Sequence, residues 1–365
     1  MNLKSKTLII AGGGSGGHVF AGIAIADAWK KAALGEVTFV GARRGIEETL
    51  VPRAGYRLLV LRLGSLVDVG LVKKIKTSIK LPFAFLKSAW ILLSKRPDFV
   101  IGVGGYASGP FILTARLMGW MWGVRVAILE QNAVPGFTNR ILGCFSHQIF
   151  TAFPGVEKEF PHGKVILTGN PVRSSLKKLP SRAHAKPFTV FIFGGSQGAI
   201  GVNTLVLDAL PFLKDLHSEL QFIHQTGEKD FERISKAYGA FGFHTYRVEK
   251  FIHDMVQAYS EASLLICRSG SSTLFEIAAV GRAAIFVPLP YHTDQQQLKN
   301  AQIFEKARAG LILEQLKSSG LDLAQLIQDL YSTPQRIEEI EKNVTAFYRP
   351  DAAQMMVSEM TRLST

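Results

Sequence analysis

Short, continuous apolar runs recur along the whole chain and predict buried parallel strands. In the first half they cover residues 7–11, 36–41, 57–63, 99–103, 125–129, 148–151 and 165–168. The pattern restarts at residues 189–193 and continues at 221–225, 246–248, 264–267, 284–287 and 311–313. Runs without polar alternation are typical of parallel strands that helices cover on both faces. We therefore predict an α/β protein.

The two apolar halves are separated by a polar stretch. Residues 174–186 contain five basic residues, a proline and no strong period, which favours a linker. A chain of 365 residues is long enough for two domains. Residues 337–363 are typical of helix, with a break expected at Pro350.

Glycine-rich turns follow the first apolar run of each half, at residues 12–17 and 194–199. Each turn is predicted to follow the end of a buried strand and to precede the start of a helix. A helix start offers unpaired N–H groups and a positive dipole end, and glycine lets a phosphate approach the backbone. The two turns predict two nucleotide-binding, Rossmann-like domains that face a central cleft.

A third glycine loop, residues 102–110, follows another predicted strand. Carboxyl ends of parallel strands share one edge of a sheet, so this loop should lie beside the first one. We expect the two loops to hold a diphosphate, through Gly14, Gly104, Gly105, Tyr106 and Ser108.

The next strand ends in Glu130, Gln131 and Asn132 at the same predicted edge. Their polar side chains, close to a glycine-bearing turn, indicate ligand contacts rather than core.

His18 follows the first glycine loop, in the first turn of the predicted helix. The helix dipole lowers the pKa of a histidine there and keeps its imidazole neutral. A neutral imidazole beside a phosphate-binding loop favours a general base. The alternative is a histidine that only forms local hydrogen bonds.

In the second half, residues 268–276 place small hydroxyl side chains at a predicted helix start. Such a start binds phosphate through backbone N–H groups and hydroxyls. Glu276, one turn further on, is placed to accept hydrogen bonds from ribose hydroxyls; the alternative is an ordinary helix cap with an exposed glutamate. Three successive amides, residues 295–297, suit sugar hydroxyls. No Asp-x-Asp pair occurs, so helix ends and Arg173 rather than a bound metal would hold a diphosphate.

The net charge of +13 comes from the first half. Residues 1–180 hold 24 Lys/Arg and 9 Asp/Glu, whereas residues 181–365 hold 18 and 20. Residues 69–97 contain seven basic residues, no acidic one, and interleaved aromatic and aliphatic positions. This pattern predicts contact with an anionic membrane surface through residues 71–95. The alternative is a core helix with a solvated basic face.

Cysteine usage and hydropathy exclude several classes of protein. Cys144 and Cys267 have no metal-site spacing and form no disulfide framework, which favours a reducing compartment. No stretch of 18 or more apolar residues occurs, and the start lacks the features of a signal peptide. We expect no membrane-spanning segment.

These segments together resemble the family 28 glycosyltransferases that add GlcNAc to lipid I in peptidoglycan synthesis. The resemblance covers nearly the whole chain and rests on residues 12–22, 102–110, 130–139, 168–173, 194–203, 224–227, 251–255, 267–276 and 288–302. It implies a GT-B fold whose C-terminal helix crosses back to the first domain. The implied N-terminal domain is residues 1–168 with 345–365, the linker 169–186, and the UDP-GlcNAc domain 187–344.

The resemblance also implies a reaction and its partners. GlcNAc moves from UDP-GlcNAc to the C4 hydroxyl of MurNAc in undecaprenyl-linked lipid I, with inversion, and lipid II results. The protein is expected as a peripheral protein at the cytoplasmic face of the cell membrane. No cofactor, metal or nucleic acid is implied; other cell-wall or division proteins are candidate partners.

Site residues carry over by matching motif. His18 is the implied base. Ile252 would meet uracil through its backbone, residues 271–274 would cradle the diphosphate, and Gln297 would contact the GlcNAc hydroxyls. The implied UDP-GlcNAc contacts are Ser15, Gly16, Gly17, Asn132, Arg173, Ser196, Ile252, Ser271, Ser272, Thr273, Leu274, Glu276 and Gln297. The chain departs from the family pattern at residues 291–294, one residue longer than usual, and at Arg308, where a small residue is common.

Other functions stay open at this point. Gly12, Gly14 and Gly17 match the dinucleotide fingerprint, and Arg43 and Arg44 stand where NAD enzymes carry an acidic residue. This favours an NADP-dependent oxidoreductase as one alternative. A non-catalytic nucleotide-sugar-binding protein and a UDP-GlcNAc epimerase or other glycolipid transferase are further alternatives. The lysine-rich apolar stretch argues for a lipid acceptor and against an epimerase.

Overall fold

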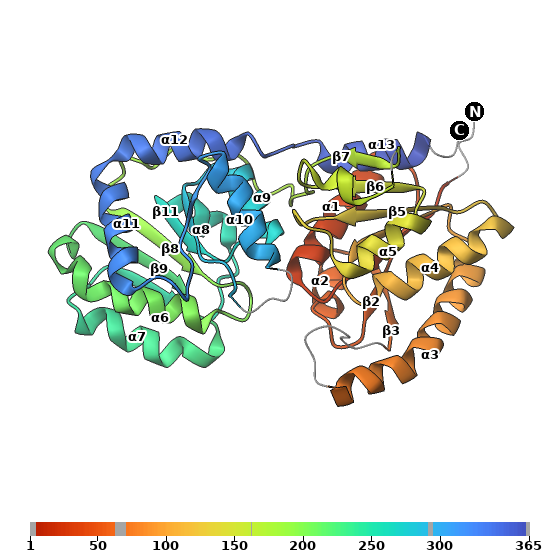
Figure 1. The fold of residues 1–365 in the computed structure, drawn as a ribbon, viewed down its shortest axis with the longest axis horizontal. Helices are drawn as coiled ribbons and strands as arrows, with labels where there is room; N and C mark the ends of the chain where they lie inside the picture. Colours follow the sequence, from red (N-terminus) through yellow and green to blue (C-terminus); the bar gives the residue numbers. More distant parts are fainter. Residues whose placement is uncertain (1–4, 63–70, 162, 291–294, 363–365) are drawn as a thin grey trace. The chain divides into compact units, whose positions relative to one another are not determined.

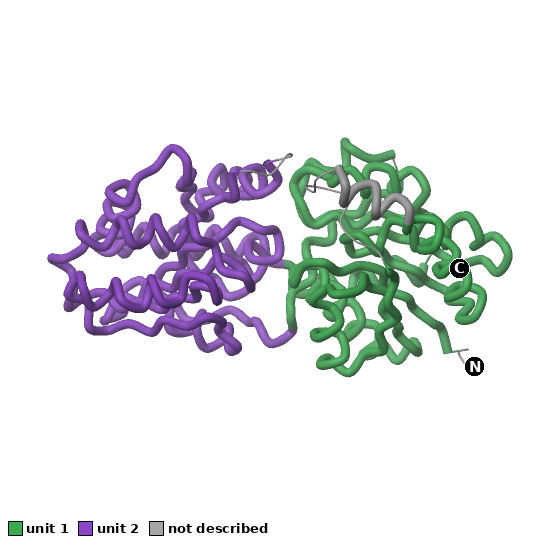
Figure 2. Tube along the Cα trace, turned by 90° about the horizontal axis from the view of Figure 1, so that it is seen from below, with its two compact units in different colours: residues 1–173, 349–365 green, residues 174–348 purple. Residues whose placement is uncertain are grey.

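The computed structural model describes residues 5–62, 71–161, 163–290 and 295–362, with the backbone alone for 71–79. The chain divides into two compact units, shown in green and purple in Figure 2. Unit 1 comprises Met1–Arg173 and Arg349–Thr365, and unit 2 comprises Ser174–Tyr348. The segment 291–294, where the chain departs from the family pattern, lies outside the described residues, as does the end of the strand predicted over 57–63.

Unit 1 is built on a seven-stranded sheet in the order β3-β2-β1-β4-β5-β6-β7. All of its strand pairs are parallel. The strands are β1 (Leu8–Gly12), β2 (Val37–Ala42), β3 (Arg57–Leu61), β4 (Phe99–Gly104), β5 (Arg125–Glu130), β6 (Gln148–Thr151) and β7 (Val165–Leu167).

Helices cover this sheet, and the last helix of the chain returns to it (Figure 1). Helix α13 packs against α1, with Met356 and Met360 buried, and Trp29 of α1 meets Phe99 edge-on with ring centroids 5.4 Å apart. The helices of unit 1 are α1 (Gly16–Lys31), α2 (Glu47–Arg53), α3 (Leu71–Lys95), α4 (Ser108–Met118), α5 (Phe137–Phe145) and α13 (Ala352–Arg362), with short 3-10 turns η1 (Gly119–Met121) and η2 (Val156–Glu159).

Unit 2 repeats the plan with six parallel strands in the order β10-β9-β8-β11-β12-β13. The strands are β8 (Phe188–Phe193), β9 (Leu220–Gln225), β10 (Tyr246–Glu249), β11 (Leu264–Cys267), β12 (Ala284–Phe286) and β13 (Leu311–Ile312). The helices are α6 (Ile200–Ala209), α7 (Phe231–Ala240), α8 (Met255–Glu261), α9 (Ser271–Val280), α10 (Gln296–Lys306), α11 (Gly320–Ser332) and α12 (Pro334–Thr345), with η3 (Leu210–Leu216) and η4 (Glu228–Asp230).

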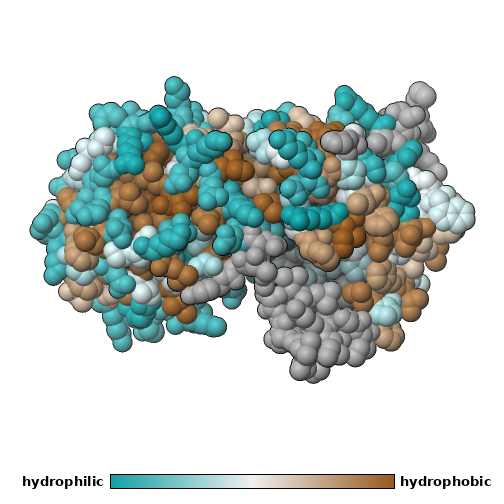
Figure 3. Space-filling view, viewed as in Figure 1, coloured by the Kyte–Doolittle hydropathy of each residue, from teal (hydrophilic) through white to brown (hydrophobic). Residues whose placement is uncertain are grey.

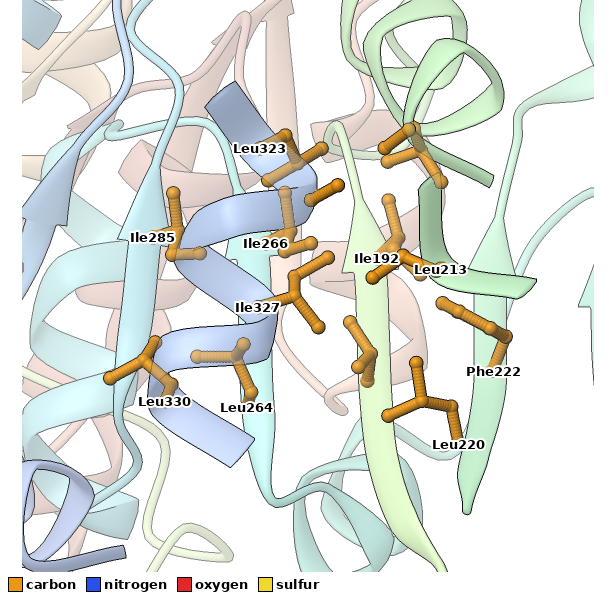
Figure 4. Packing of buried hydrophobic residues seen from close by; sticks show 14 of the residues in the cluster. Ile192, Leu213, Leu220, Phe222, Leu264, Ile266, Ile285, Leu323, Ile327 and Leu330 are labelled. Atoms are coloured by element: carbon orange, nitrogen blue, oxygen red, sulfur yellow. The ribbon is translucent and has the colours of Figure 1, made fainter. Parts of the chain in front are cut away.

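The core of unit 2 shows why continuous apolar runs become strands here. Ile192 of β8 and Ile266 of β11 lie in one buried cluster with Ile327 and Leu330 of α11 (Figure 4). Burying such side chains contributes about 1.5–3 kcal/mol each relative to leaving them exposed.

The predicted α/β class with two Rossmann-like domains is confirmed. Every predicted apolar run contains a strand, with ends that differ by one or two residues where they are described. The break predicted near Pro350 is also confirmed, because α12 ends at Thr345 and α13 begins at Ala352. In each sheet the strand order reverses beside the first strand, at β1/β4 and at β8/β11, and ligands of such sheets bind at the carboxyl ends of those strands.

Candidate active site

Two glycine loops of unit 1, which follow β1 and β4, touch each other as expected. The N–H of Gly13 donates to the carbonyl oxygen of Gly104 over 3.1 Å. Gly105 has a φ of +84°, and a Cβ there would overlap the carbonyl oxygen of Gly13. No residue with a side chain fits this approach without moving a loop.

His18 lies in the first turn of α1, where Ser15 caps the helix. Its Nδ1 lies 3.0 Å from the carbonyl oxygen of Gly13 and 3.0 Å from Oγ of Ser15. Because a carbonyl oxygen only accepts, Nδ1 carries the proton and Nε2 keeps its lone pair. A Cβ on Gly104 would lie 2.7 Å from Nε2, so this nitrogen faces the second glycine loop.

The pKa of His18 is lowered, as predicted, but burial is the main cause rather than the helix dipole. The hydrogen bond with Gly13 and the charge of Glu47 partly oppose that shift. The imidazole is therefore neutral at neutral pH and presents a lone pair, which is the state that a general base needs.

The expected diphosphate ligands differ in exposure. Gly14 is exposed and lies against the ring of Tyr106, which is exposed too. The N–H of Gly14, however, donates to Oε2 of Glu47 over 2.9 Å. Ser108 is buried at the start of α4. Of the expected diphosphate ligands, the N–H of Gly14 and the side chain of Ser108 are therefore not exposed hydrogen-bond donors.

Arg173 lies beside the start of α1. Its guanidinium stacks over the ring of Phe20, 4.4 Å from the centroid, and a Cβ on Gly16 would touch the same ring. The structure thereby brings Arg173 near residues Ser15, Gly16 and Gly17, which are far from it in sequence.

The prediction that Glu130 and Gln131 contact a ligand is wrong, because both side chains are buried. The Glu130 carboxylate accepts hydrogen bonds from the backbone and side chain of Asn132 at 2.8 and 3.2 Å, from the N–H of Gly136 at 3.1 Å and from Nδ2 of Asn139 at 2.8 Å. Burial raises the pKa of Glu130, and these bonds oppose that shift. Glu130 therefore shapes the loop that presents Asn132.

Unit 2 contains a cavity of about 870 Å³ at the carboxyl ends of its strands. Its walls include the second glycine turn, residues 194–199, together with residues after β9, β10 and β11. Three of the predicted donor contacts line it: Ser196, Thr273 and Gln297. Oε1 of Gln297 accepts from the N–H of Leu289 over 3.0 Å, so its amide NH₂ is the group left for a ligand.

The start of α9 makes one side of this cavity suitable for an anion. Gly270 and Thr273 line the cavity, and Ser271 and Ser272 occupy the first turn between them. First-turn N–H groups and the helix dipole attract negative charge.

Arg268 lines the same cavity, although it is not among the contacts predicted from the sequence. Its guanidinium donates to the carbonyl oxygens of Val287 and Pro288 and to Oε1 of Gln315, at 2.7–3.0 Å. Burial lowers its pKa to about 10, which leaves it protonated at neutral pH. Its position directly after β11, before a helix start, is the sequence signal that marks it.

Five other predicted donor contacts of unit 2 do not line the cavity: Ser271 and Ser272 of the first turn of α9, and Ile252, Leu274 and Glu276. The N–H of Ile252 donates to Oε1 of Gln225 over 2.8 Å. Leu274 is fully buried and its N–H donates to the carbonyl oxygen of Gly270. Oε2 of Glu276 accepts from the hydroxyl of Tyr259 over 3.2 Å.

Gln225 links two walls of the cavity. Besides accepting from Ile252, its amide donates to the carbonyl oxygen of Gly195 over 2.9 Å. Gln225 is buried, and no motif in the sequence distinguishes it from other strand ends.

Comparisons with known proteins agree with this arrangement. The model of the glycosyltransferase family 28 N-terminal domain matches residues 8–151, and that of the family 28 C-terminal domain matches residues 189–356. A protein of Citrifermentans bemidjiense is 43% identical over 357 residues, which cover 97% of this chain and 98% of the relative. A protein of Myxococcus xanthus is 43% identical over 95% of this chain and 90% of its own length. Both are named UDP-N-acetylglucosamine--N-acetylmuramyl-(pentapeptide) pyrophosphoryl-undecaprenol N-acetylglucosamine transferase.

Solved structures give the same result. The crystal structure of Acinetobacter baumannii MurG matches with a TM-score of 0.79 and 31% identity, over 98% of this chain and 99% of that one. The UDP-GlcNAc 2-epimerase of Neisseria meningitidis, bound to UDP-GlcNAc, matches with a TM-score of 0.68 but only 12% identity, which shows a shared fold alone. Since the family models match both units and the relatives match nearly end to end, the chain belongs to glycosyltransferase family 28.

Proposed function

We propose that the protein is an inverting glycosyltransferase of peptidoglycan synthesis. It moves GlcNAc from UDP-GlcNAc to the C4 hydroxyl of MurNAc in undecaprenyl-diphosphoryl-MurNAc-pentapeptide. One observation carries this proposal: relatives at 43% identity, matched over 97% of the chain, are named for this transfer. The oxidoreductase alternative is not favoured, because it leaves the cavity of unit 2 without a function.

Unit 2 holds the donor in this proposal. The first turn of α9 and the Arg268 guanidinium stabilise the UDP diphosphate, and no metal is needed for that charge. The NH₂ group of Gln297 meets a sugar hydroxyl or the acetamido oxygen. Ser196 lines the same cavity from the glycine turn after β8.

The base is His18 of unit 1. Its Nε2 takes the proton of the acceptor hydroxyl while the hydroxyl oxygen forms a bond to the anomeric carbon of GlcNAc. The bond from that carbon to the β-phosphate oxygen breaks, and its electron pair leaves with UDP. A single displacement of this kind inverts the anomeric centre. The neutral imidazole with a free Nε2 lone pair supports this role.

Attachment to the membrane is the second part of the proposal. Helix α3 exposes Phe83, Leu86, Trp90 and Leu93 at helical spacing, with Phe83 69% and Trp90 65% exposed. Figure 3 shows hydrophobic side chains gathered over the part of unit 1 that contains α3 and α4.

Neighbouring elements extend this apolar surface. Trp120, in the turn η1 after α4, is 80% exposed, and α4 packs directly on α3. Lys80 and Lys87 are exposed on α3; the side chains of the lysines at 73, 74 and 76 lie outside the described residues. None of the helices among the described residues is long and apolar enough to cross a membrane. A basic, aromatic surface of this kind suits peripheral binding to anionic lipid, here at the cytoplasmic face.

The test is a transfer assay with purified protein, radiolabelled UDP-GlcNAc and a short-chain lipid I analogue. Label should enter the lipid, and His18→Ala should slow transfer by about 10²–10⁴-fold while the fold, checked by circular dichroism, is retained. Binding of UDP-GlcNAc without any transfer would contradict the proposed transferase activity and favour a non-catalytic nucleotide-sugar-binding protein.

A further inference from the structure

Glu47 is a buried acidic residue at the start of α2. Neither the family resemblance nor the proposed reaction gives Glu47 a role. Its Oε2 accepts from the N–H of Gly14 over 2.9 Å, and its Oε1 accepts from the N–H of Ala42 over 2.8 Å. One carboxylate therefore joins the catalytic loop after β1 to the end of β2. Charge-assisted hydrogen bonds of this kind are stronger than neutral ones and fix geometry.

The glycines around Glu47 fit the carboxylate closely. A Cβ on Gly13, Gly41 or Gly45 would overlap atoms of the Glu47 side chain. Three glycines, one in the catalytic loop and two on either side of the β2 end, thus leave room for this single side chain. A buried carboxylate is costly unless its oxygens are hydrogen-bonded, and here two backbone N–H groups satisfy them.

We propose that Glu47 is a positioning residue for the base: it fixes the 12–14 loop so that the carbonyl of Gly13 holds His18 with Nδ1 protonated and Nε2 free. The inference rests on the proposed function of His18 as base. Gly13 links the two side chains, because its carbonyl contacts Nδ1 and belongs to the same peptide group as the Gly14 N–H that donates to Glu47. The Glu47 charge also acts on the His18 ring and favours the imidazolium that forms during transfer.

The arrangement resembles other catalytic bases that a third group orients, with one difference. In a serine protease triad the carboxylate bonds the imidazole directly. Here a backbone carbonyl contacts the imidazole, and the carboxylate acts one residue away by holding the adjacent N–H. Losing Glu47 should therefore disturb the orientation of His18 without removing any group that touches substrate.

The first test reads the tautomer of His18 directly. Protein labelled with ¹⁵N-histidine contains nine labelled side chains, and the spectrum of His18→Ala identifies the resonances of His18. In the wild type, Nε2 of His18 should have the shift of an unprotonated nitrogen. In Glu47→Gln, which keeps one acceptor but presents an NH₂ to a backbone donor, we expect a mixture of the two neutral tautomers. An unchanged tautomer in Glu47→Gln would overturn the proposal.

The second test separates positioning from folding. In Glu47→Gln we expect kcat to fall roughly 10- to 100-fold, which is less than the loss expected when a general base is removed altogether. The KM for UDP-GlcNAc should stay within about twofold of the wild-type value. Glu48→Gln is the matched control, because Glu48 is the exposed neighbour on α2 and should behave as wild type. A rise in KM for UDP-GlcNAc without loss of kcat would contradict the assignment.

A double variant completes the test. If Glu47 acts through His18, the variant with both His18→Ala and Glu47→Gln should be no slower than His18→Ala alone. Multiplied losses would show an independent structural role and overturn the inference. If the wild type transfers no GlcNAc at all, the proposed function fails, and the tautomer measurement still decides the role of Glu47.

Discussion

At the scale of single residues, the proposed chemistry depends on the protonation state of His18. Its base role requires a neutral imidazole, and burial lowers its pKa below the ordinary value near 6.5. Transfer should therefore stay on its plateau as the pH is lowered through 6.5, and decline only at more acid pH as Nε2 becomes protonated. The measurement is the pH profile of kcat at saturating substrates. A half-maximal rate at or above pH 6.5 would contradict the lowered pKa.

Removing the imidazole gives a second residue-scale prediction. His18→Ala should lower kcat by about 10²–10⁴-fold, the usual contribution of a general base. Binding of UDP, measured by calorimetry, should not change, because the residues assigned to it belong to unit 2. If His18→Ala weakens UDP binding as much as it lowers kcat, the side chain serves binding rather than proton transfer.

The approach of the two glycine loops gives a third prediction, for which the chain offers a matched control. Gly105 and Gly55 have similar φ values, +84° and +79°, but a Cβ on Gly55 meets nothing within 4 Å. Gly55→Ala should destabilise unit 1 by about 1 kcal/mol, the cost of its backbone conformation. Gly105→Ala should cost more and also abolish transfer, because it displaces Gly13. Equal effects of the two variants on unfolding and kcat would show that the close approach is unimportant.

The hydrogen-bond partners of several acidic residues could not be predicted from the sequence. Glu47, Glu130 and Glu276 all follow or precede glycine-rich or small-residue motifs, yet the structure engages each one differently. Glu47 and Glu130 face inward to backbone N–H groups, and Glu276 accepts from Tyr259. Motif position predicts that a carboxylate lies near a strand end; which donors reach it depends on segments distant in sequence.

At the scale of secondary-structure elements, helix α3 carries the prediction about the membrane. Trp90→Ser should reduce binding to vesicles that contain anionic lipid by tenfold or more, because a fully buried aromatic side chain contributes about 1.5–3 kcal/mol. Co-sedimentation measures the binding. Phe212→Ser is the control, since Phe212 is also an exposed aromatic residue but belongs to unit 2. Equal losses for both variants would show that α3 is not the attachment site.

A buried network joins α6, β9 and α7 beneath the cavity of unit 2. His224 contacts the hydroxyl of Tyr238 at 2.9 Å and Oδ1 of Asn203 at 3.0 Å. Because the Asn203 oxygen only accepts, the proton of the neutral ring is on Nε2. Asn203 also donates to the carbonyl oxygen of Thr226 and to Asp230, both of which line the cavity.

Burial lowers the pKa of His224 to about 3, which links this network to pH. Below pH 6.5 the unfolded chain binds a proton that the folded protein does not. The contribution of His224 to the free energy of unfolding is therefore greatest above pH 6.5. It falls by about 1.4 kcal/mol per pH unit as the pH drops toward 3. Urea unfolding near pH 5 and pH 7 measures the slope, and His224→Gln should have a smaller one. Identical slopes would contradict a neutral, buried His224.

Elements were the part of the fold most open to prediction. Parallel strands covered on both faces appear as unbroken apolar runs, such as residues 99–103 and 264–267, and these became β4 and β11. Strand ends were predicted less well, because residues such as Gly104 extend a strand without an apolar side chain. Helix α3 contains Pro82, although proline usually kinks or ends a helix because it lacks the backbone N–H and its ring clashes with the preceding turn.

At the scale of the whole molecule, each unit repeats one plan: a parallel sheet, a glycine turn after its first strand, and polar residues at the carboxyl ends. The order of strands, 3-2-1-4-5-6 in both units with a seventh strand in unit 1, follows from this plan. The return of residues 349–365 to unit 1 depends on tertiary packing of Met356 and Met360. The family resemblance predicted that return, whereas the apolar pattern alone did not.

The division of the assigned residues between the units fits a two-substrate enzyme. The proposed base, His18, and the proposed positioning residue, Glu47, belong to unit 1, and the cavity with its helix start belongs to unit 2. Variants of Glu47 or His18 should therefore change the rate, and variants of Arg268 or Thr273 should change the affinity for UDP-GlcNAc.

The central claim is a single, inverting displacement onto the lipid-linked sugar. The most direct measurement is the nuclear magnetic resonance spectrum of the product formed from α-linked UDP-GlcNAc and a short-chain lipid I analogue. We predict one β-linked GlcNAc on the C4 oxygen of MurNAc, with one UDP released for each transfer. An α linkage, or release of UDP and free GlcNAc without transfer, would contradict the account.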